Sequence, residues 1–130
     1  MMLMTDANLN DIQVQVETRY IEDQSNPAQN YYVFAYTVTI RNKGRQAAQL
    51  LTRHWVITDS NHKVHEVRGD GVVGEQPVLE PGQQFVYTSG TMLETSVGTM
   101  KGSYQMKGID GFRFDAMIDV FVLSTPRVLH

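Results

Sequence analysis

The chain has 130 residues, a formal net charge of −3 and no cysteine. Its length suits one domain, which we take as residues 1–130, and no apolar run approaches the ~18 residues that a membrane span requires. The absence of cysteine excludes disulfides, thiolate zinc sites and a cysteine nucleophile. The acidic balance argues against general nucleic-acid binding, because such proteins normally carry a basic excess.

The two ends of the chain carry little pattern. The first six residues do not have the basic and apolar segments of a signal peptide, and a cysteine-free composition is compatible with a reducing compartment. We therefore expect a cytoplasmic protein. Residues 1–11 and 125–130 are expected to be flexible tails.

Alternation of apolar and polar side chains at period two dominates the sequence and predicts β-strands. In chain order, these stretches are residues 12–17, 32–41, 51–57, 62–67, 85–87 and 112–123. Turn-forming residues separate them, at Asn26-Pro27, Asn42-Lys43-Gly44, Asp59-Ser60-Asn61, Pro81-Gly82 and Gly108-Ile109-Asp110-Gly111. No window of about a dozen residues has the apolar spacing of a helix. The sequence therefore predicts an all-β antiparallel sandwich of about seven or eight strands without a long helix.

Inward-facing positions of these strands predict the core. In the stretch 51–57, Leu51, Trp55 and Ile57 share one face, although Arg53 interrupts that face. In the last stretch, one face is predicted to carry Phe112, Phe114, Ala116, Ile118, Val120 and Val122. We expect the core to include Trp55, Tyr36, Phe34, Phe114 and Ile118.

The segment Leu79-Glu80-Pro81-Gly82, followed by Phe85 and Tyr87, resembles a corner of fibronectin type III domains. In that corner a leucine caps the core, Pro-Gly turns the chain, and an aromatic residue begins the next strand. A buried tyrosine hydroxyl that bonds to upstream backbone is the physical basis of such corners. The resemblance supports an immunoglobulin-like or fibronectin type III-like sandwich.

Several ordered blocks, spread over roughly residues 12–124, resemble the ApaG family. They are residues 32–36, 40–42, 53–59, 67–77, 79–82, 85, 87–90 and 98–104. The resemblance implies a fibronectin type III-like sandwich and a family whose bacterial members have no established activity. It also implies a gene that tends to neighbour one for a diadenosine tetraphosphate hydrolase, and a role in cobalt and magnesium resistance. Related domains in eukaryotic F-box and polymerase-interacting proteins imply a protein-binding module.

Gly69, Gly71 and Gly74 fit the pattern G-x-G-x-x-G, which allows two interpretations. Their backbone amides can cradle a phosphate, as in nucleotide-binding loops. Alternatively, they supply the backbone conformations that turns between strands need. The dinucleotide motif requires a following helix, which Pro77 prevents, and Glu75 adds negative charge where an anion would lie. We favour the turn and keep binding of pyrophosphate or a nucleotide as the alternative.

A second set of candidates has the chemistry of ligands for a divalent cation such as cobalt or magnesium. The set is Asp59, His62, His65, Glu66 and Asp70. His62 and His65 are three residues apart, and on a strand this spacing directs side chains to opposite faces. Solvent-facing residues of a turn and an edge strand explain the set equally well. We expect no cofactor and keep a divalent cation as an alternative.

No group of residues in the sequence indicates catalysis. Ser89 lacks the flanking glycines of a nucleophile elbow. Asp115 and Asp119 share a predicted strand face but lie about 13 Å apart, which is too far for an acid–base pair. We therefore expect a non-catalytic module that binds an unidentified protein, because antiparallel sandwiches offer exposed edge strands. Binding of a phosphate-bearing nucleotide or a divalent cation is the alternative function.

Overall fold

The computed structural model describes residues 9–126, which form eight strands and two short 3-10 helices. In chain order the elements are β1 (Ile12–Tyr20), η1 (Glu22–Gln24), η2 (Pro27–Gln29), β2 (Tyr32–Asn42), β3 (Ala48–Asp59), β4 (Val64–Asp70), β5 (Val78–Leu79), β6 (Gln84–Leu93), β7 (Val97–Gly108) and β8 (Arg113–Ser124). All strand pairings are antiparallel. The all-β prediction is confirmed. Within the described residues no helix has the length and apolarity to cross a membrane.

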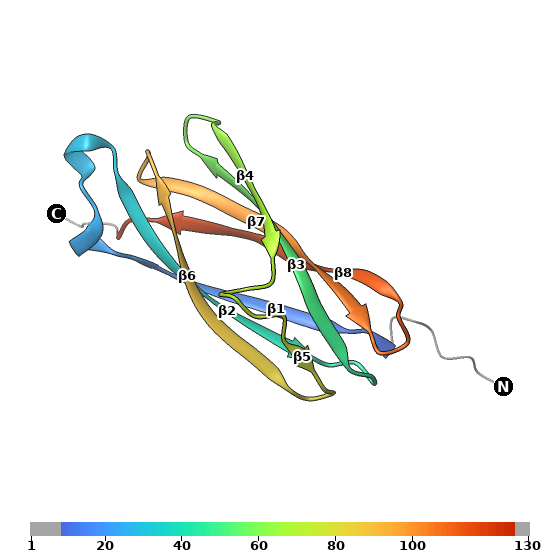
Figure 1. The fold of residues 1–130 in the computed structure, drawn as a ribbon. Coiled ribbons are helices and arrows are strands. Elements are labelled where there is room, and N and C mark those ends of the chain that lie inside the picture. Colours follow the sequence, from blue (N-terminus) through green and yellow to red (C-terminus); the bar gives the residue numbers. More distant parts are fainter. Residues whose placement is uncertain (1–8, 127–130) are drawn as a thin grey trace.

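The strands form two layers, which Figure 1 shows as a twisted sandwich. One sheet has the order β1-β2-β6, and the other has the order β4-β3-β7-β8, with the short β5 beside β3. β1 packs against β8, so the sandwich is closed along that side. The edge strands on the opposite side are β6 in one sheet and β4 in the other. This asymmetry leaves the second side open.

The core lies between the two layers and is rich in aromatic rings. Four of the five predicted core residues are buried: Trp55, Tyr36, Phe34 and Ile118. Phe114 is only partly buried at the periphery of the core. The Trp55 indole makes edge-on contacts with the rings of Tyr36, Tyr104 and Phe121 at centroid distances of 5.3, 6.3 and 5.9 Å. Such edge-to-face packing is the geometry that aromatic rings prefer.

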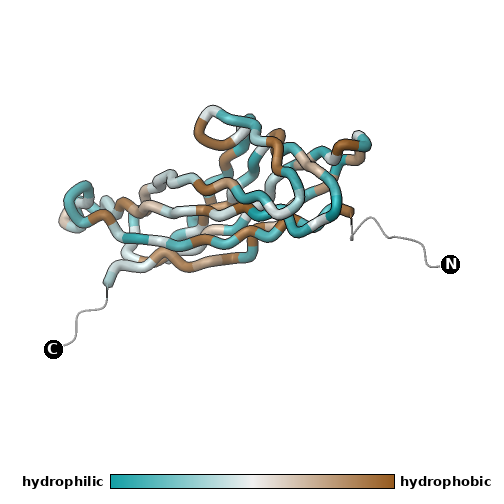
Figure 2. Tube along the Cα trace, turned by 90° about the horizontal axis from the view of Figure 1, so that it is seen from below, coloured by the Kyte–Doolittle hydropathy of each residue, from teal (hydrophilic) through white to brown (hydrophobic). Residues whose placement is uncertain are grey.

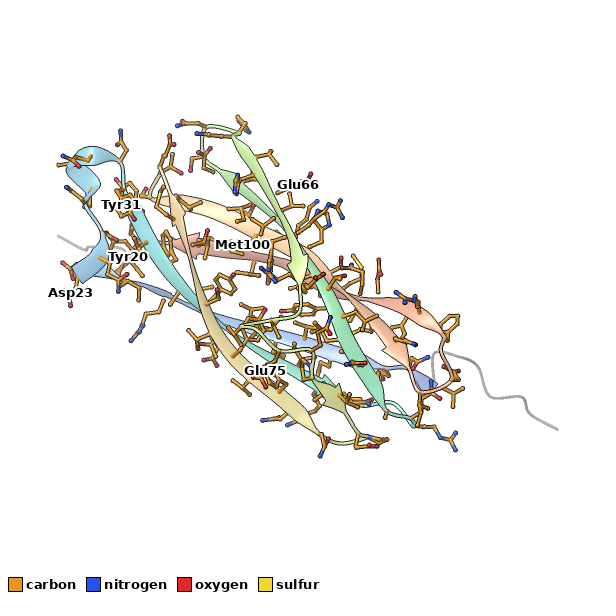
Figure 3. All side chains as sticks on the ribbon, in the orientation of Figure 1. Tyr20, Asp23, Tyr31, Glu66, Glu75 and Met100 are labelled. Atoms are coloured by element: carbon orange, nitrogen blue, oxygen red, sulfur yellow. The ribbon has the colours of Figure 1, made fainter. Side chains whose placement is uncertain are left out.

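The alternation along the strands is visible in Figure 2, where hydrophobic and hydrophilic residues follow one another along the chain. Met100, labelled in Figure 3, has no exposed surface and lies between the layers. Its neighbours on β7 that face the same way, Tyr104 and Met106, are also buried. β7 therefore forms the centre of the larger sheet.

β8 contradicts the prediction that a single set of alternating residues faces the core. The register with β7 shifts between Met100, which pairs with Phe121, and Gly102, which pairs with Ile118. The extra residue of this β-bulge reverses the phase of the strand. Val120 and Val122 are therefore 62% and 56% exposed, while Leu123 is fully buried. The prediction is right from Phe114 to Ile118 and wrong beyond it, and Phe112, which lies before the strand, is 45% exposed.

The predicted corner between residues 79 and 87 has a buried leucine and a positive-φ glycine. Leu79 is buried, and Gly82 has a φ of 86°. The buried Asn42 side chain donates to the carbonyl oxygen of Leu79 at 2.8 Å. The Tyr87 hydroxyl bonds to the hydroxyl of Tyr104 rather than to backbone upstream, so this corner differs from the one it resembles.

Residues 9–11, which the sequence assigned to a flexible tail, are bonded to the β2–β3 turn. The Leu9 carbonyl accepts from the amide of Arg45 at 3.0 Å, and the Asp11 carbonyl accepts from the amide of Lys43 at 2.7 Å. At the other end, the Thr125 amide donates to the Ser96 carbonyl at 3.1 Å. The rest of the predicted tails, residues 1–8 and 127–130, lies outside the described residues.

Candidate functional site

The glycine-rich segment that follows β4 is a tight hairpin turn. The amides of Val72 and Glu75 each donate to the other residue's carbonyl, at 2.8 and 2.9 Å. The Gly71 amide donates to the Leu51 carbonyl at 2.8 Å. Because these three amides already have acceptors inside the protein, they do not face a common ligand. This favours the turn interpretation of the glycine pattern over the phosphate cradle.

The conformation of this turn explains two of its glycines. Gly71 and Gly74 have φ values of 63° and 81°, which glycine adopts without steric cost. A side chain at Gly71 would also collide with the carbonyl oxygen of Glu75. Val73 has a φ of 44° and is 55% exposed, which is an unusual conformation for a β-branched residue. Nothing in the sequence pattern indicates this strained, exposed valine.

Gly69 has a different role from the other two glycines, because it lies in β4 and its φ is not positive. A Cβ atom there would lie 2.8 Å from each of Cζ, Nη1 and Nη2 of Arg53. These equal distances place the flat face of the guanidinium against the Gly69 backbone. Gly69 therefore makes room for Arg53, its partner in the β3–β4 register.

Arg53 faces the space between the sheets, on the same side of β3 as Trp55 and Ile57. Its Nη1 donates to the carbonyl oxygens of Asp70 and Gly71, both at 2.9 Å. Within residues 9–126 the guanidinium forms no ion pair with a carboxylate. The structure thus places an unneutralised cation between the two layers.

The residues predicted as cation ligands are spread over the β3–β4 turn and both faces of β4, although Asp59 and His65 line a common cavity. One oxygen of the Asp59 carboxylate accepts from the amides of Asn61 and Lys63, at 2.8 and 3.0 Å, which stabilises the β3–β4 turn. His62 lies in this turn, with a φ of 63°. These bonds assign Asp59 a structural role in the turn.

The other three predicted ligands are divided between the faces of β4. Glu66 lies 3.2 Å from Nε2 of His54 on the outer face, and Figure 3 labels this glutamate. His65, the preceding residue, is exposed on the opposite face of β4, which lines the opening between the sheets. Asp70 ends the strand. Among the residues that the structure describes, no group of three or more His, Asp or Glu side chains is placed to hold a metal ion.

The open side of the sandwich contains a cleft between β4 and β6. One cavity of about 380 Å³ lies between the sheets, and a second of about 180 Å³ continues it toward the β3–β4 turn. Both cavities are lined by Ile57, His65, Thr91 and Met92, so we treat them as one β4–β6 cleft. Its remaining lining residues are Tyr36, Arg53, Trp55, Asp59, Lys63, Val67, Ser89, Gly90, Leu93 and Glu94.

Small side chains on β6 keep the cleft open. Ser89 and Thr91 occupy the inward positions that follow the buried Tyr87, and Gly90 lies between them. None of these residues fills the space that larger side chains would occupy at a closed sandwich edge. The floor is apolar and consists of Tyr36, Trp55 and Ile57. The walls carry the polar groups.

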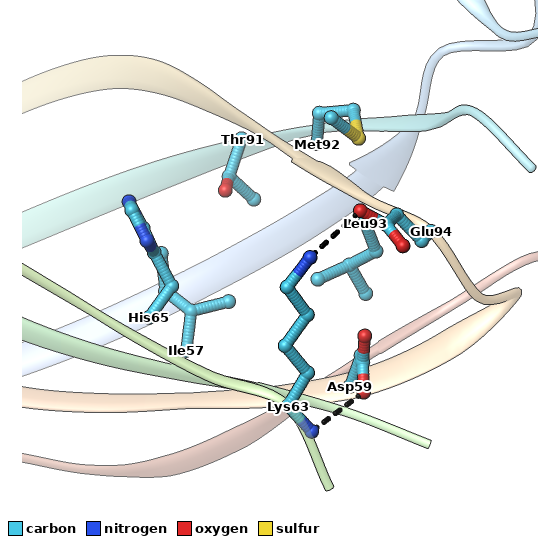
Figure 4. Close-up of a pocket in the computed structure, with 8 residues that line it drawn as sticks. All are labelled: Ile57, Asp59, Lys63, His65, Thr91, Met92, Leu93 and Glu94. Carbon is cyan, nitrogen blue, oxygen red and sulfur yellow. Dashed lines mark hydrogen bonds and ion pairs between the residues drawn. The ribbon is translucent and has the colours of Figure 1, made fainter. Parts of the chain in front are cut away.

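An ion pair crosses one end of the cleft, as Figure 4 shows. Lys63 Nζ, from the turn before β4, lies 2.9 Å from Glu94 Oε1, just after β6. The hydrogen bond to Glu94 and its charge raise the pKa of the Lys63 ammonium above its usual value. Both side chains are more than half exposed, and exposed ion pairs of this kind contribute little to stability.

A buried pair of tyrosines lies behind the cleft. The hydroxyl groups of Tyr87 and Tyr104 bond to each other. Burial raises the pKa of Tyr87 to about 12. Burial, followed by the charge of Tyr87, raises the pKa of Tyr104 well above its ordinary value. Both phenols are therefore neutral near pH 7 and unsuited to act as bases.

The cleft was missed in the sequence, although a signal for it was present. Arg53 interrupts an otherwise apolar face of β3, and an inward-facing arginine needs space and polar partners. The second sign was on β6, where three consecutive small residues leave the space that an inward-facing arginine needs: Ser89, Gly90 and Thr91.

Comparison with known proteins gives consistent matches. A model of the ApaG domain matches residues 22–108. The Protein ApaG of Azoarcus sp. strain BH72 is 61% identical over 119 residues, covering 92% of this chain and 94% of that protein. The Protein ApaG of Dechloromonas aromatica is 55% identical and covers 98% of this chain and all of that protein.

Solved structures agree with the sequence matches. The crystal structure of the putative ApaA protein from Bordetella pertussis has a TM-score of 0.91 and 50% sequence identity. The alignment covers 93% of this chain and 98% of that one. Family model, full-length relatives and structure all point to the same assignment, and this chain belongs to the ApaG family.

Proposed function

We propose that this ApaG-family domain is a non-catalytic binding module and that its partner is another protein. The observation that supports the proposal is the β4–β6 cleft, which has an apolar floor and polar walls. Two edge strands flank it, and an edge strand offers unpaired backbone groups to an incoming segment. An extended segment that pairs with such an edge gains main-chain hydrogen bonds, and its alternate side chains reach the pocket.

The residues around the cleft support binding more than catalysis. Tyr87 and Tyr104 hold their protons at neutral pH, and Lys63 is engaged by Glu94. In the described part of the chain, no nucleophile lies within hydrogen-bond reach of a group that could activate it inside the cleft. We propose that the interaction takes place in the cytoplasm, with which the cysteine-free composition is compatible.

Nucleotide binding at the glycine turn is less well supported. The amides of Gly71, Val72 and Glu75 are engaged within the protein, and Glu75 itself is acidic. A cavity of about 550 Å³ is lined by Gly69, Asp70 and Arg68, but its lining does not include Gly71 or Gly74. Because the amides of the turn are already bonded, the structure supports a ligand at the cleft better than a phosphate at the turn.

A peptide-display selection tests the proposal with one blocking variant. Thr91 lines both parts of the cleft, so Thr91→Trp should fill it. Val86, on the same strand, is 50% exposed and absent from the cleft lining, so Val86→Trp is the matched control. We expect random-sequence peptides selected on the wild-type domain to bind Thr91→Trp at least about tenfold more weakly and to bind Val86→Trp unchanged. Equal binding to both variants, or no selectable peptide, would contradict the proposal.

A further inference from the structure

The position of Arg53 identifies the chemistry of the segment that the cleft receives. Its guanidinium is held at one end of the cleft by Gly69, on whose backbone it lies, and by the carbonyls of Asp70 and Gly71. A side chain fixed in this way loses little further entropy when it binds a ligand. The cation is therefore preorganised.

Part of the guanidinium is available to a ligand. It carries five N–H donors, and among the described residues only Nη1 donates to protein atoms. No buried side-chain nitrogen or oxygen in the described residues lacks a partner, so the remaining donors are accessible to solvent. Because no carboxylate of the described chain pairs with Arg53, its charge is not neutralised from within.

The rest of the cleft is polar on one wall and apolar on its floor. Ser89 and Thr91 present hydroxyl groups from β6, and His65 faces them from β4. The Trp55 and Ile57 side chains lie two and four residues along β3 from Arg53, on the same face. In the β3–β4 register Arg53 pairs with Gly69, and the buried Trp55 pairs with Val67, which lines the cleft. An extended segment that pairs with the free edge of β4 would therefore place one side chain beside Arg53 at Gly69 and its neighbour two positions away beside Val67.

Acidic groups cluster at the opposite end of the cleft, so the two ends are not equivalent. Asp59 and Glu94 lie there beside Lys63, and the positive charge of Lys63 is already paired with Glu94. The Arg53 end carries the unneutralised positive charge. A carboxylate is thus favoured at Arg53 and disfavoured near Asp59 and Glu94.

From these positions we propose that the β4–β6 cleft binds an extended, acidic segment of the partner protein. One Asp or Glu side chain of the segment pairs with the guanidinium of Arg53, and an apolar residue two positions away packs on Val67. The inference rests on the proposed protein-binding function and adds the charge and spacing of the partner segment. Planar guanidinium groups recognise carboxylates through paired hydrogen bonds, which makes the match specific.

A double-mutant cycle tests the proposal with peptides selected on the wild-type domain. We expect each tight-binding peptide to contain an acidic residue whose replacement by Gln weakens binding to the wild type at least about tenfold. In Arg53→Gln, the Gln peptide and its acidic parent should bind within about twofold of each other. Arg68→Gln is the matched control, because it removes an equal charge from the outer face of β4 and should preserve the tenfold difference.

The outcomes separate the two proposals. Peptides that bind the cleft without an acidic residue, or a tenfold preference that persists in Arg53→Gln, would overturn the inference and leave the protein-binding function standing. Failure of every peptide to bind the cleft would overturn both. The comparison of Glu with Gln peptides on the wild type needs no protein variant, so equal binding of the two peptides there overturns the inference even if Arg53→Gln does not fold.

Discussion

Gly71 occupies a position that combines a left-handed backbone with no room for a side chain. Its φ is 63°, and an added Cβ would collide with the carbonyl of Glu75. Gly74 shares the positive φ of 81° but has open space around it. The two glycines therefore separate the cost of backbone conformation from the cost of a clash.

We expect Gly71→Ala to destabilise the domain by more than about 1 kcal/mol, because strain and clash add. Gly74→Ala should lower the free energy of unfolding by about 1 kcal/mol or less, because it strains the backbone without creating a clash. Urea denaturation followed by tryptophan fluorescence measures both values. A Gly71→Ala domain of wild-type stability that has lost affinity for pyrophosphate would instead support the phosphate cradle.

Tyr87 makes stability depend on pH in the alkaline range. Burial raises its pKa from 10.0 to about 12, so the folded chain holds this proton more tightly than the unfolded chain does. The corresponding stability is fully present below pH 10 and is lost as pH rises through about 12. We expect the unfolding free energy to fall over this window and to fall less steeply in Tyr87→Phe. Tyr31→Phe, at a 43% exposed tyrosine, is the control and should leave the profile unchanged.

At the scale of the strand, the bulge in β8 decides which side chains stabilise the fold. Leu123 is fully buried, whereas Val122 is 56% exposed. We expect Leu123→Ala to cost about 2–5 kcal/mol and Val122→Ala less than about 0.5 kcal/mol. Thermal and urea denaturation measure the difference. Equal costs at the two positions would show that the phase of β8 is not reversed after Ile118.

The sequence predicted regular strands well and irregular ones poorly. Alternation in β2 predicted its inward set, and Phe34 and Tyr36 are buried as expected. Around Val120 the alternation predicted that the same face of β8 continues into the core. Apolar residues occupy both faces of the strand there, so the pattern could not reveal the extra residue of the bulge. Bulges depend on pairing with a neighbouring strand, which a single sequence does not show.

The candidate site could be predicted only in fragments. The glycine pattern was visible, but its meaning depends on which amides are already bonded, and the bond from Gly71 to Leu51 joins distant parts of the chain. The sequence shows that Arg53 interrupts an apolar face. Its contact with Gly69, and the small residues of β6 across the cleft, depend on how the strands and sheets pack together, which a single sequence does not show.

For the whole molecule, the proposed function requires no bound metal. The predicted ligands Asp59 and Glu66 are engaged in separate interactions, with the β3–β4 turn and with His54. A ligand that binds only the folded state would raise the melting temperature. We expect millimolar cobalt or magnesium to shift the melting temperature by less than about 1 °C. A larger shift that disappears in Glu66→Gln or His65→Asn would support a cation site.

The one-sided closure of the sandwich also sets the order in which its strands separate. β4 is bonded to β3 alone, and its inward residues His65, Val67 and Gly69 bury little apolar surface beside the cleft. β7 is bonded on both sides and carries Met100, Tyr104 and Met106 in the core. Local opening at β4 therefore needs less free energy than opening at β7, and backbone amides of β4 should exchange with deuterium first. A partner held in the cleft should slow that exchange, whereas equal rates in the free domain would contradict this order of separation.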